Sequence, residues 1–174
     1  MKLSDEITIN VYRYLDQGRN GDIILRNFYL GSYEMDVMLL KKSGYITEFE
    51  IKISRSDFFN DFKKNRWGEN KHECIGKGIG SSNRFMFVVP KGMVSVSEVP
   101  KHAGLAYYEP FNNPLYPNQG HVNIIKPAPM IHKNKHFVTA EDFHQLAYKV
   151  SFRETTFRNI VEKYKSENRI SKSI

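Results

Sequence analysis

The segment Arg84–Val89, with the sequence Arg-Phe-Met-Phe-Val-Val, constrains the fold more than any other part of this 174-residue chain. A short, nearly all-apolar run of this kind is typical of a strand that is buried on both faces. Pro90 ends the run, because proline cannot continue a central strand. The order strand, helix, apolar strand upstream predicts a crossover connection, which would make this strand parallel to its neighbour.

The strand before that crossover has two chemically different faces. Side chains alternate along a strand, so Phe49, Ile51 and Ile53 are expected to face the core. Glu48, Glu50 and Lys52 alternate with them and form a charged face. We expect Glu48 on this face to be exposed to solvent. The segments that we predict as strands in this part of the chain are Asn27–Ser32, Glu34–Leu40 and Tyr45–Ile53.

Helical spacing and capping residues predict three helices. The first covers Ser4–Gln17, with Ser4 as its N-cap, and the second begins at Ser54–Asp57. A capping box at Thr139 begins a third helical segment, about residues 139–168, which is either two helices or one with a polar window, because Arg153 and Glu154 interrupt its apolar stripe. The remaining predictions are a loop over Trp67–Ser82, a strand at Leu105–Tyr108 and an edge strand at Val122–Ile125.

This order of elements predicts an α/β fold with a central mixed sheet flanked by helices. The length and the 40% apolar content fit a single domain over residues 1–174. No stretch approaches the roughly 20 apolar residues of a membrane span. The first residues lack the apolar run of a signal peptide, and the single cysteine, Cys74, excludes an internal disulfide. We therefore expect no membrane partner and an intracellular, cytoplasmic location.

The chain is basic, with a formal charge of +7 and a pI of about 9.4. Eight Lys and Arg residues stand against four acidic residues between Lys52 and Arg84. A second excess, seven against three, lies between Lys149 and Lys172. Clustered positive charge is typical of proteins that bind a polyanion, although many basic proteins bind no nucleic acid.

Asp36, Glu50 and Lys52 form the group best suited to chemistry. Glu50 and Lys52 share one face of their strand, and Asp36 lies in the neighbouring strand. Magnesium is commonly held by one or two carboxylates with phosphate and water, and it activates water for phosphodiester cleavage. A lysine beside the carboxylates can orient that water, and the Ile51 carbonyl is a further candidate ligand. The competing interpretation is a weak surface pair on an exposed strand.

Asp36, thirteen intervening residues and then Glu50-x-Lys52 across a hairpin resemble the PD-(D/E)xK nuclease superfamily. The segments Glu50–Phe58, Arg84–Pro90 and Val99–Leu105 are similar to the MmcB-like DNA-repair nuclease family. The resemblance implies a restriction-endonuclease-like fold, in which Asp36 and Glu50 bind Mg²⁺, or Mn²⁺ in its place, and Lys52 assists the water. Met35 departs from the pattern, since many members have proline at that position.

Many superfamily members also place a glutamate on the first helix, facing the site. Glu6 is the candidate for this additional catalytic carboxylate, and Asp5 is the alternative. The competing interpretation is that acidic residues in a first turn only offset the helix dipole.

The hairpin between the two strands tests the proposed site. A two-residue loop at Ser43–Gly44 would pair Asp36 with Ile51 and place the aspartate on the wrong face. A three-residue loop pairs Lys41 with Tyr45 and Asp36 with Glu50. We therefore predict a three-residue or bulged turn, with Gly44 in a left-handed conformation.

Residues just beyond the trio are candidates for binding a nucleic acid backbone. The serines of this set could equally serve only as helix caps, and its lysines could be plain solvated charges. The set consists of Ser54, Arg55, Ser56, Lys63, Lys64 and Arg66. His72-x-Cys74 and His132-x-x-x-His136 lack the companion ligands of a zinc site.

Together these features lead us to expect a magnesium-dependent endodeoxyribonuclease that acts in DNA repair, recombination or phage DNA processing. The protein would then be cytoplasmic, nucleoid-associated or phage-encoded, and a homodimer would suit double-strand cutting. The alternatives are a catalytically inactive nucleic-acid-binding protein of the same fold, or a nuclease acting on RNA or branched DNA.

Overall fold

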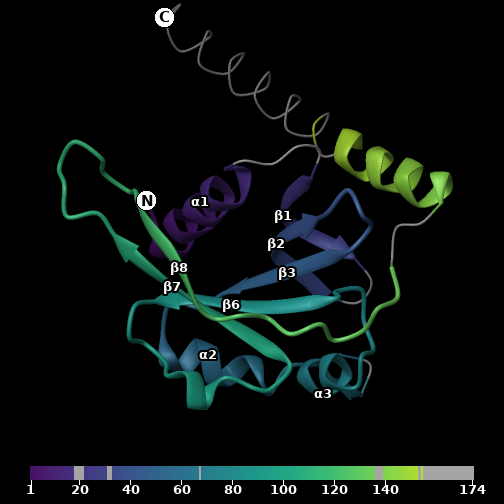
Figure 1. The fold of residues 1–174 in the computed structure, drawn as a ribbon, viewed down its shortest axis with the longest axis horizontal. Helices are drawn as coiled ribbons and strands as arrows, with labels where there is room; N and C mark the ends of the chain where they lie inside the picture. The colour runs from purple at the N-terminus through teal and green to yellow at the C-terminus, as the bar shows by residue number, and fades with distance from the viewer. Residues whose placement is uncertain (18–21, 31–32, 67, 136–138, 153, 155–174) are drawn as a thin grey trace, which may run out of the picture. The chain divides into compact units, whose positions relative to one another are not determined.

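The structure is a computed structural model that describes residues 1–17, 22–30, 33–66, 68–135, 139–152 and 154. The chain divides into two compact units, Met1–His136 and Phe137–Ile174. The first unit holds the sheet and all the named helices and strands (Figure 1). In the second unit, residues 140–152 are helical and begin the C-terminal helical segment expected from residue 139.

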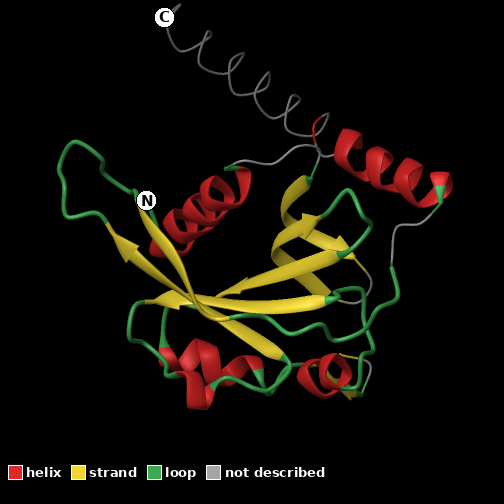
Figure 2. Cartoon of the chain, in the orientation of Figure 1, coloured by secondary structure: helices red, strands yellow, loops and turns green. Residues whose placement is uncertain are grey.

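A six-stranded mixed sheet forms the centre of the first unit, in the order β1-β2-β3-β6-β7-β8 (Figure 2). Neighbours are antiparallel except on the two sides of β6, which runs parallel to both β3 and β7. The strand bounds are β1 Ile23–Leu30, β2 Tyr33–Leu40, β3 Ile46–Ile51, β6 Arg84–Pro90, β7 Ala103–Pro110 and β8 Gly120–Lys126.

The apolar segment at Arg84 is the central strand that its composition predicts. The inner residues of β6 are buried, and Phe85, Phe87 and Met86 belong to cores on opposite faces of the sheet. Its parallel pairing with β3 confirms the expected crossover. β8 lies at the edge of the sheet, in agreement with the edge strand predicted at Val122–Ile125. The prediction of an α/β fold with a mixed sheet flanked by helices is therefore confirmed.

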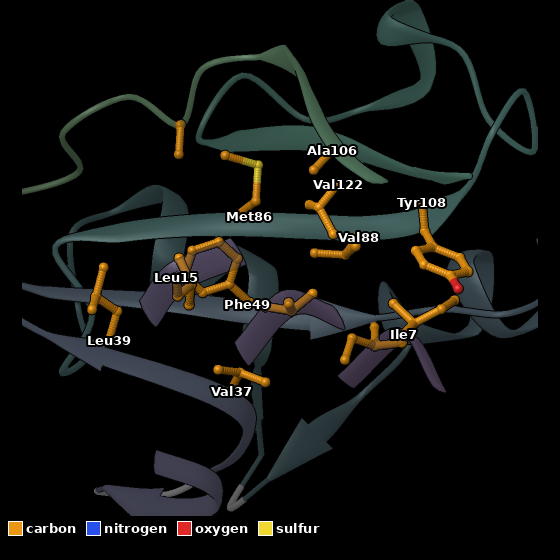
Figure 3. Close-up of a cluster of buried hydrophobic side chains, with 13 residues drawn as sticks. Ile7, Leu15, Val37, Leu39, Phe49, Met86, Val88, Ala106, Tyr108 and Val122 are labelled. Carbon is orange, nitrogen blue, oxygen red and sulfur yellow. The ribbon is translucent and has the colours of Figure 1, made fainter. Parts of the chain in front are cut away.

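Helix α1, Leu3–Asp16, covers one face of the sheet with an apolar stripe (Figure 1). Ile7, Val11 and Leu15 pack against side chains from β2, β3, β6 and β7 (Figure 3). Phe49 and Ile51 point to this side, in agreement with the predicted alternation along β3. We call this side of the sheet the α1 face.

Helices α2, Arg55–Asp61, and α3, Lys71–Gly76, cover the opposite face (Figure 1). Under β6 and β7 this α2/α3 face is apolar, with Phe58 of α2 against Phe87 at a ring-centroid distance of 4.9 Å. A short ribbon, β4 Asn65–Arg66 and β5 Glu69–Asn70, connects the two helices. Among the described residues, no helix is long and apolar enough to cross a bilayer.

Several predicted boundaries were wrong for local reasons. α1 begins at Leu3 and its N-cap residue is Lys2, so Ser4 lies inside the helix. β3 ends at Ile51, and Ile53 is 42% exposed instead of facing the core. The expected loop from residue 67 contains α3, which Asn70 caps by accepting hydrogen bonds from the backbone N–H groups of His72 and Glu73.

The remaining boundary errors are extensions. β1 begins four residues before the predicted Asn27 and pairs Ile23 with Leu40, so both strands of that hairpin span their full length. β7 likewise extends the expected Leu105–Tyr108 strand at both ends. Pairing with a neighbouring strand carries each element past its most apolar residues, and this tertiary effect outweighs local propensity.

Candidate functional site

The turn between β2 and β3 has the geometry that the site requires. Val37 pairs with Phe49 and Leu40 with Ile46, so the same register places Asp36 opposite Glu50. The Lys41 N–H donates to the Tyr45 carbonyl at 2.9 Å, which closes a three-residue loop. Gly44 has a φ of +87°, in the left-handed region. The predicted odd-length turn with a left-handed glycine is confirmed, and Asp36 shares a face with Glu50.

Regular strand pairing is interrupted at Asp36, with β3 on one side and with β1 on the other. The β2–β3 ladder ends at Val37, and on the other side the β1–β2 ladder skips the pair of Asn27 and Asp36. Asn27 has a φ of +48°, a conformation that asparagine tolerates better than most residues. The Asp36 carboxylate instead accepts the Ile51 backbone N–H at 2.7 Å. A side chain thus replaces a ladder contact where the two strands separate.

Asp36 is half-buried beside a second negative charge. Burial, together with the nearby Glu50 carboxylate, raises the pKa of Asp36 to about 6. The Ile51 N–H and the more distant lysines oppose this rise without cancelling it. Two carboxylates that repel each other in a partly desolvated place are a setting that a divalent cation would stabilise.

Glu50 and Lys52 lie under α2, where a third acidic residue joins them. The Lys52 ammonium is 2.7 Å from Glu50 Oε1 and 2.8 Å from Asp61 Oδ1. Burial by itself would lower the pKa of Lys52, but Glu50 and Asp61 outweigh it and the pKa lies above its usual range. Lys52 is therefore a permanent cation held between two carboxylates.

Lys71 of α3 completes the buried pairing from the other side. Its ammonium is 2.8 Å from Glu50 Oε2 and 3.2 Å from Glu48 Oε1. Burial favours a protonated Glu50, but the positive charge of Lys71 and then Lys52 outweighs it and lowers the pKa of Glu50. Glu48 also accepts a hydrogen bond from the Ser82 hydroxyl at 2.6 Å. The prediction that Glu48 is solvated surface was wrong, because α3 covers it.

Asp61 links this group to two histidines. Its Oδ2 is 2.7 Å from His72 Nε2, and His72 Nδ1 is 3.1 Å from His102 Nε2. Burial opposes ionisation of Asp61, but the His72 hydrogen bond and the positive charges of Lys71 and Lys52 hold its pKa well below its usual range. We use the name charged cluster for Glu48, Glu50, Lys52, Asp61, Lys64, Lys71 and His72.

Lys64 differs from the other lysines of the charged cluster in its exposure. Its ammonium is 2.6 Å from Asp61 Oδ1 and 3.3 Å from Glu50 Oε1. Its side chain is 48% exposed, whereas those of Lys52 and Lys71 are 4% and 2% exposed. Lys64 thus covers the cluster from the solvent side.

The other predicted site residues take varied positions. Glu6 lies on α1 and accepts the Tyr108 hydroxyl at 2.6 Å, and no described hydrogen bond or ion pair joins it to the trio. Ser54 caps α2 by accepting the Asp57 N–H, and its hydroxyl is 3.0 Å from that of Ser56. The role of Ser54 as a cap is therefore confirmed.

The basic residues of the predicted backbone-binding set do not form one surface. Arg55 forms an ion pair with Glu98 at 2.5 Å and donates to the Met93 carbonyl. Lys63 is exposed, and its ammonium donates to the side chain of the neighbouring Asn60 at 3.4 Å. The Arg66 side chain lies outside the described part of the structure.

Sequence reasoning missed Asp61, Lys71 and His72 as members of the site. Asp61 lies on the α2 turn that faces β3, three residues after Phe58, which gives it a helical spacing to a core residue. Lys71 and His72 lie in α3, which was expected to be loop. The Asn70 cap was the one local signal for that helix.

The residues present fit magnesium as a two-carboxylate site. Among the described residues, no group of three His, Cys, Asp or Glu side chains is arranged to hold a metal ion. Asp36 and Glu50 supply the two carboxylates of the commoner magnesium arrangement, which water and phosphate complete, and both Glu50 oxygens contact lysine ammonium groups here. The Lys52 N–H bonds to β6, so the Ile51 N–H and carbonyl point to β2, the side on which Asp36 lies.

No protein-family model matches the chain, and no curated protein matches it. Among solved structures, the chain is similar to SPO1766, a protein of unknown function from Silicibacter pomeroyi. The two share 18% identity and a TM-score of 0.53, over 90% of this chain and 89% of that protein. The likeness extends along nearly the whole of both chains, and at this identity it shows a common α/β fold.

Proposed function

We propose that this protein is a magnesium-dependent endodeoxyribonuclease of the PD-(D/E)xK superfamily, with the restriction-endonuclease-like arrangement of strands. The register of β2 and β3 carries the proposal, because it puts Asp36 opposite Glu50 on the face that also holds Lys52. The positive φ of Asn27, which lies opposite Asp36, supports it further, since strained backbone tends to cluster at functional sites.

Asp36 and Glu50 would hold the metal ion, together with the Ile51 carbonyl. Bound magnesium would lower the pKa of an attacking water and offset charge on the phosphate. The half-buried position of Asp36 gives that carboxylate the better access to solvent, while α2 and α3 exclude water from Glu50.

The environment of Lys52 defines its part in the reaction. Its pKa is raised by two neighbouring carboxylates, so it is a proton donor in hydrogen bonds and a poor general base. Lys52 would therefore orient the water or stabilise negative charge on the phosphate. Asp61 holds the Lys52 ammonium at 2.8 Å and so limits its movement.

Asp36→Asn is the sharpest test of this function. The variant keeps an oxygen that can accept the Ile51 N–H, so the fold should survive. We expect Mg²⁺-dependent nicking of supercoiled plasmid to fall by at least about 100-fold, since a metal ligand is lost. Asp57→Asn is the matched control, because that carboxylate is 48% exposed and 3.9 Å from the Lys52 ammonium. Activity that survived both Asp36→Ala and Lys52→Ala would rule the assignment out.

One observation favours a second function, a catalytically inactive nucleic-acid-binding protein. Both oxygens of Glu50 contact lysine ammonium groups, and the residue is 3% exposed. A purely structural ion-pair cluster would look the same. Calorimetric titration with MgCl₂ separates the two, since an inactive site would show no metal binding that depends on Asp36.

DNA as the substrate rests on the resemblance and on the basic composition of the chain. RNA and branched DNA junctions are the alternative substrates. Cleavage of matched DNA, RNA and junction substrates at one fixed salt concentration distinguishes them, because backbone binding depends steeply on salt. Gel filtration on the DNA complex would test for a homodimer.

A further inference from the structure

Lys64 occupies a place in the charged cluster that no catalytic role requires. Its ammonium and that of Lys52 both contact the same two oxygens, Glu50 Oε1 and Asp61 Oδ1. Lys52 alone already bridges these oxygens at 2.7 and 2.8 Å. The second ammonium therefore adds positive charge at a carboxylate that the proposed function assigns to magnesium.

The Lys64 side chain can leave while its backbone stays fixed. Its N–H donates to the Asp61 carbonyl at 3.2 Å, and its carbonyl accepts the Lys71 N–H at 3.0 Å. These bonds tie the residue to α2 and to α3, so the flexible stem is the part that is free to move. Almost half of that stem and head is exposed, so departure would transfer little apolar surface to water.

The charges of the site change in a way that suits a divalent cation. Glu48, Glu50 and Asp61 share three lysine ammonium groups, Asp57 lies 3.9 Å from the Lys52 ammonium, and Asp36 lies opposite Glu50. Withdrawal of Lys64 removes one positive charge from Glu50 and Asp61, so the site becomes more negative by one charge. Magnesium would balance that charge, whereas with Lys64 in place it meets a like charge 3.3 Å from its ligand Glu50.

We propose that Lys64 is a tethered cation that covers Glu50 in the free protein and swings out to a phosphate of the incoming nucleic acid. This inference rests on the proposed magnesium site. It couples substrate binding to metal binding, because the same movement that contacts the phosphate removes the charge that competes with Mg²⁺. Such coupling is reciprocal, so metal binding also favours the substrate-bound position of Lys64.

Calorimetric titration of the full chain with MgCl₂, at pH 8 and low salt without nucleic acid, tests the coupling. Lys64→Met keeps the stem and removes the charge, and we expect its Kd for Mg²⁺ to fall by about tenfold. Lys63→Met is the matched control, since Lys63 is exposed and, within the described residues, its ammonium has no ion pair with the charged cluster, so the Kd of this variant should change by less than about twofold. Lys64→Arg keeps the charge and should remain close to the wild type.

A second titration uses a short phosphorothioate DNA duplex that resists cleavage. The duplex should tighten Mg²⁺ binding to the wild type more than to Lys64→Met, because the variant has no charge left to remove. Equal Kd values for Lys64→Met and Lys63→Met, with wild-type binding that depends on Asp36, would overturn the role of Lys64 alone. An absence of Mg²⁺ binding in the wild type and in Lys64→Met would overturn both this role and the proposed function.

Discussion

The two faces of β3 are buried to the same degree by opposite chemistry. Phe49 and Ile51, under α1, are 4% and 7% exposed, while Glu48 and Glu50, under α2 and α3, are each 3% exposed. The α1 face is stabilised by the removal of apolar surface from water, which requires no particular orientation. The opposite face is stabilised by contacts that each need a partner at a definite distance.

This difference matters because buried ion pairs are weak contributors to stability. Removing charges from water costs several kcal/mol per ion, and the attraction between them often only offsets that cost. The α1 face shows that the same strand can be buried with apolar side chains alone. A cluster of charges is therefore a costly way to bury the other face, which is consistent with the proposed function.

Loss of one member of the charged cluster should have the largest effect. Lys71→Met leaves Glu48 and Glu50 buried without their shared ammonium. We expect the free energy of unfolding at pH 8 to fall by about 3–5 kcal/mol, because an uncompensated charge remains in the interior. Urea unfolding followed by circular dichroism measures this, and repetition at pH 4 should show a smaller loss as carboxylates become protonated.

Ile7→Ala provides the matched change on the α1 face. Ile7 is fully buried, and its truncation should cost about 2–5 kcal/mol through lost apolar contacts and a cavity. That loss should be the same at pH 4 and pH 8, since no titratable group is affected. If the Lys71→Met loss were also independent of pH, the contrast between the two faces would be wrong.

The sequence predicts the α1 face well, because apolar periodicity is a local signal. The stripe of Ile7, Val11 and Leu15 gives the helix, and alternation along β3 assigns Phe49 and Ile51 to the core. The apolar run at Arg84 gives the central parallel strand. The errors lie at element ends, such as Ile53, where pairing with a neighbouring strand and not local propensity sets the limit.

The site is less predictable, because its members meet only after folding. Asp36, Glu50 and Lys52 are identified by spacing, but only a three-residue turn pairs Asp36 with Glu50, and the structure has that register. Lys71 is 21 residues from Glu50 in the sequence, and α3 brings the two within 2.8 Å. No periodicity links a lysine in one helix to a glutamate in a distant strand, so the covering of Glu48 could not be foreseen.

Asp36→Asn tests whether the charged face is destabilised by its own carboxylates when no cation is bound. Its expected effect on stability is smaller than that of Lys71→Met or Ile7→Ala. The pKa of Asp36 is about 6 when folded and 3.8 as its ordinary value, so the folded protein binds the proton more tightly. The contribution of Asp36 to stability is therefore fully present below pH 4 and is lost as the pH rises through 6. Asparagine resembles the protonated form, so the variant should be more stable than the wild type by about 1–2 kcal/mol at pH 8, after allowance for solvent screening.

The difference in stability between Asp36→Asn and the wild type should change sign when Mg²⁺ is present. Millimolar MgCl₂ should raise the melting temperature of the wild type and leave that of Asp36→Asn unchanged, because only the native carboxylate binds the cation. Below pH 4 the wild type and Asp36→Asn should have the same melting temperature. If the variant were less stable than the wild type at pH 8 without Mg²⁺, the ionised Asp36 would stabilise the fold. The idea that burial and repulsion by Glu50 make it destabilising would then be wrong.

The smallest expected effect concerns Glu6, which lies on the α1 face. The Tyr108 hydroxyl donates to Glu6 Oε1 on the α1 face, and Asn10 approaches the same hydroxyl at 3.4 Å. Tyr108→Phe removes this contact, and we expect a loss of about 0.5–1.5 kcal/mol in urea unfolding, the usual net value of one hydrogen bond. Plasmid nicking with Mg²⁺ should be unchanged, because Glu6 has no described contact with Asp36, Glu50 or Lys52. If a Glu6→Gln variant kept its stability but lost nicking, this carboxylate would take part in the reaction. The assignment of stability to the α1 face and of the proposed site to the opposite face would then be wrong.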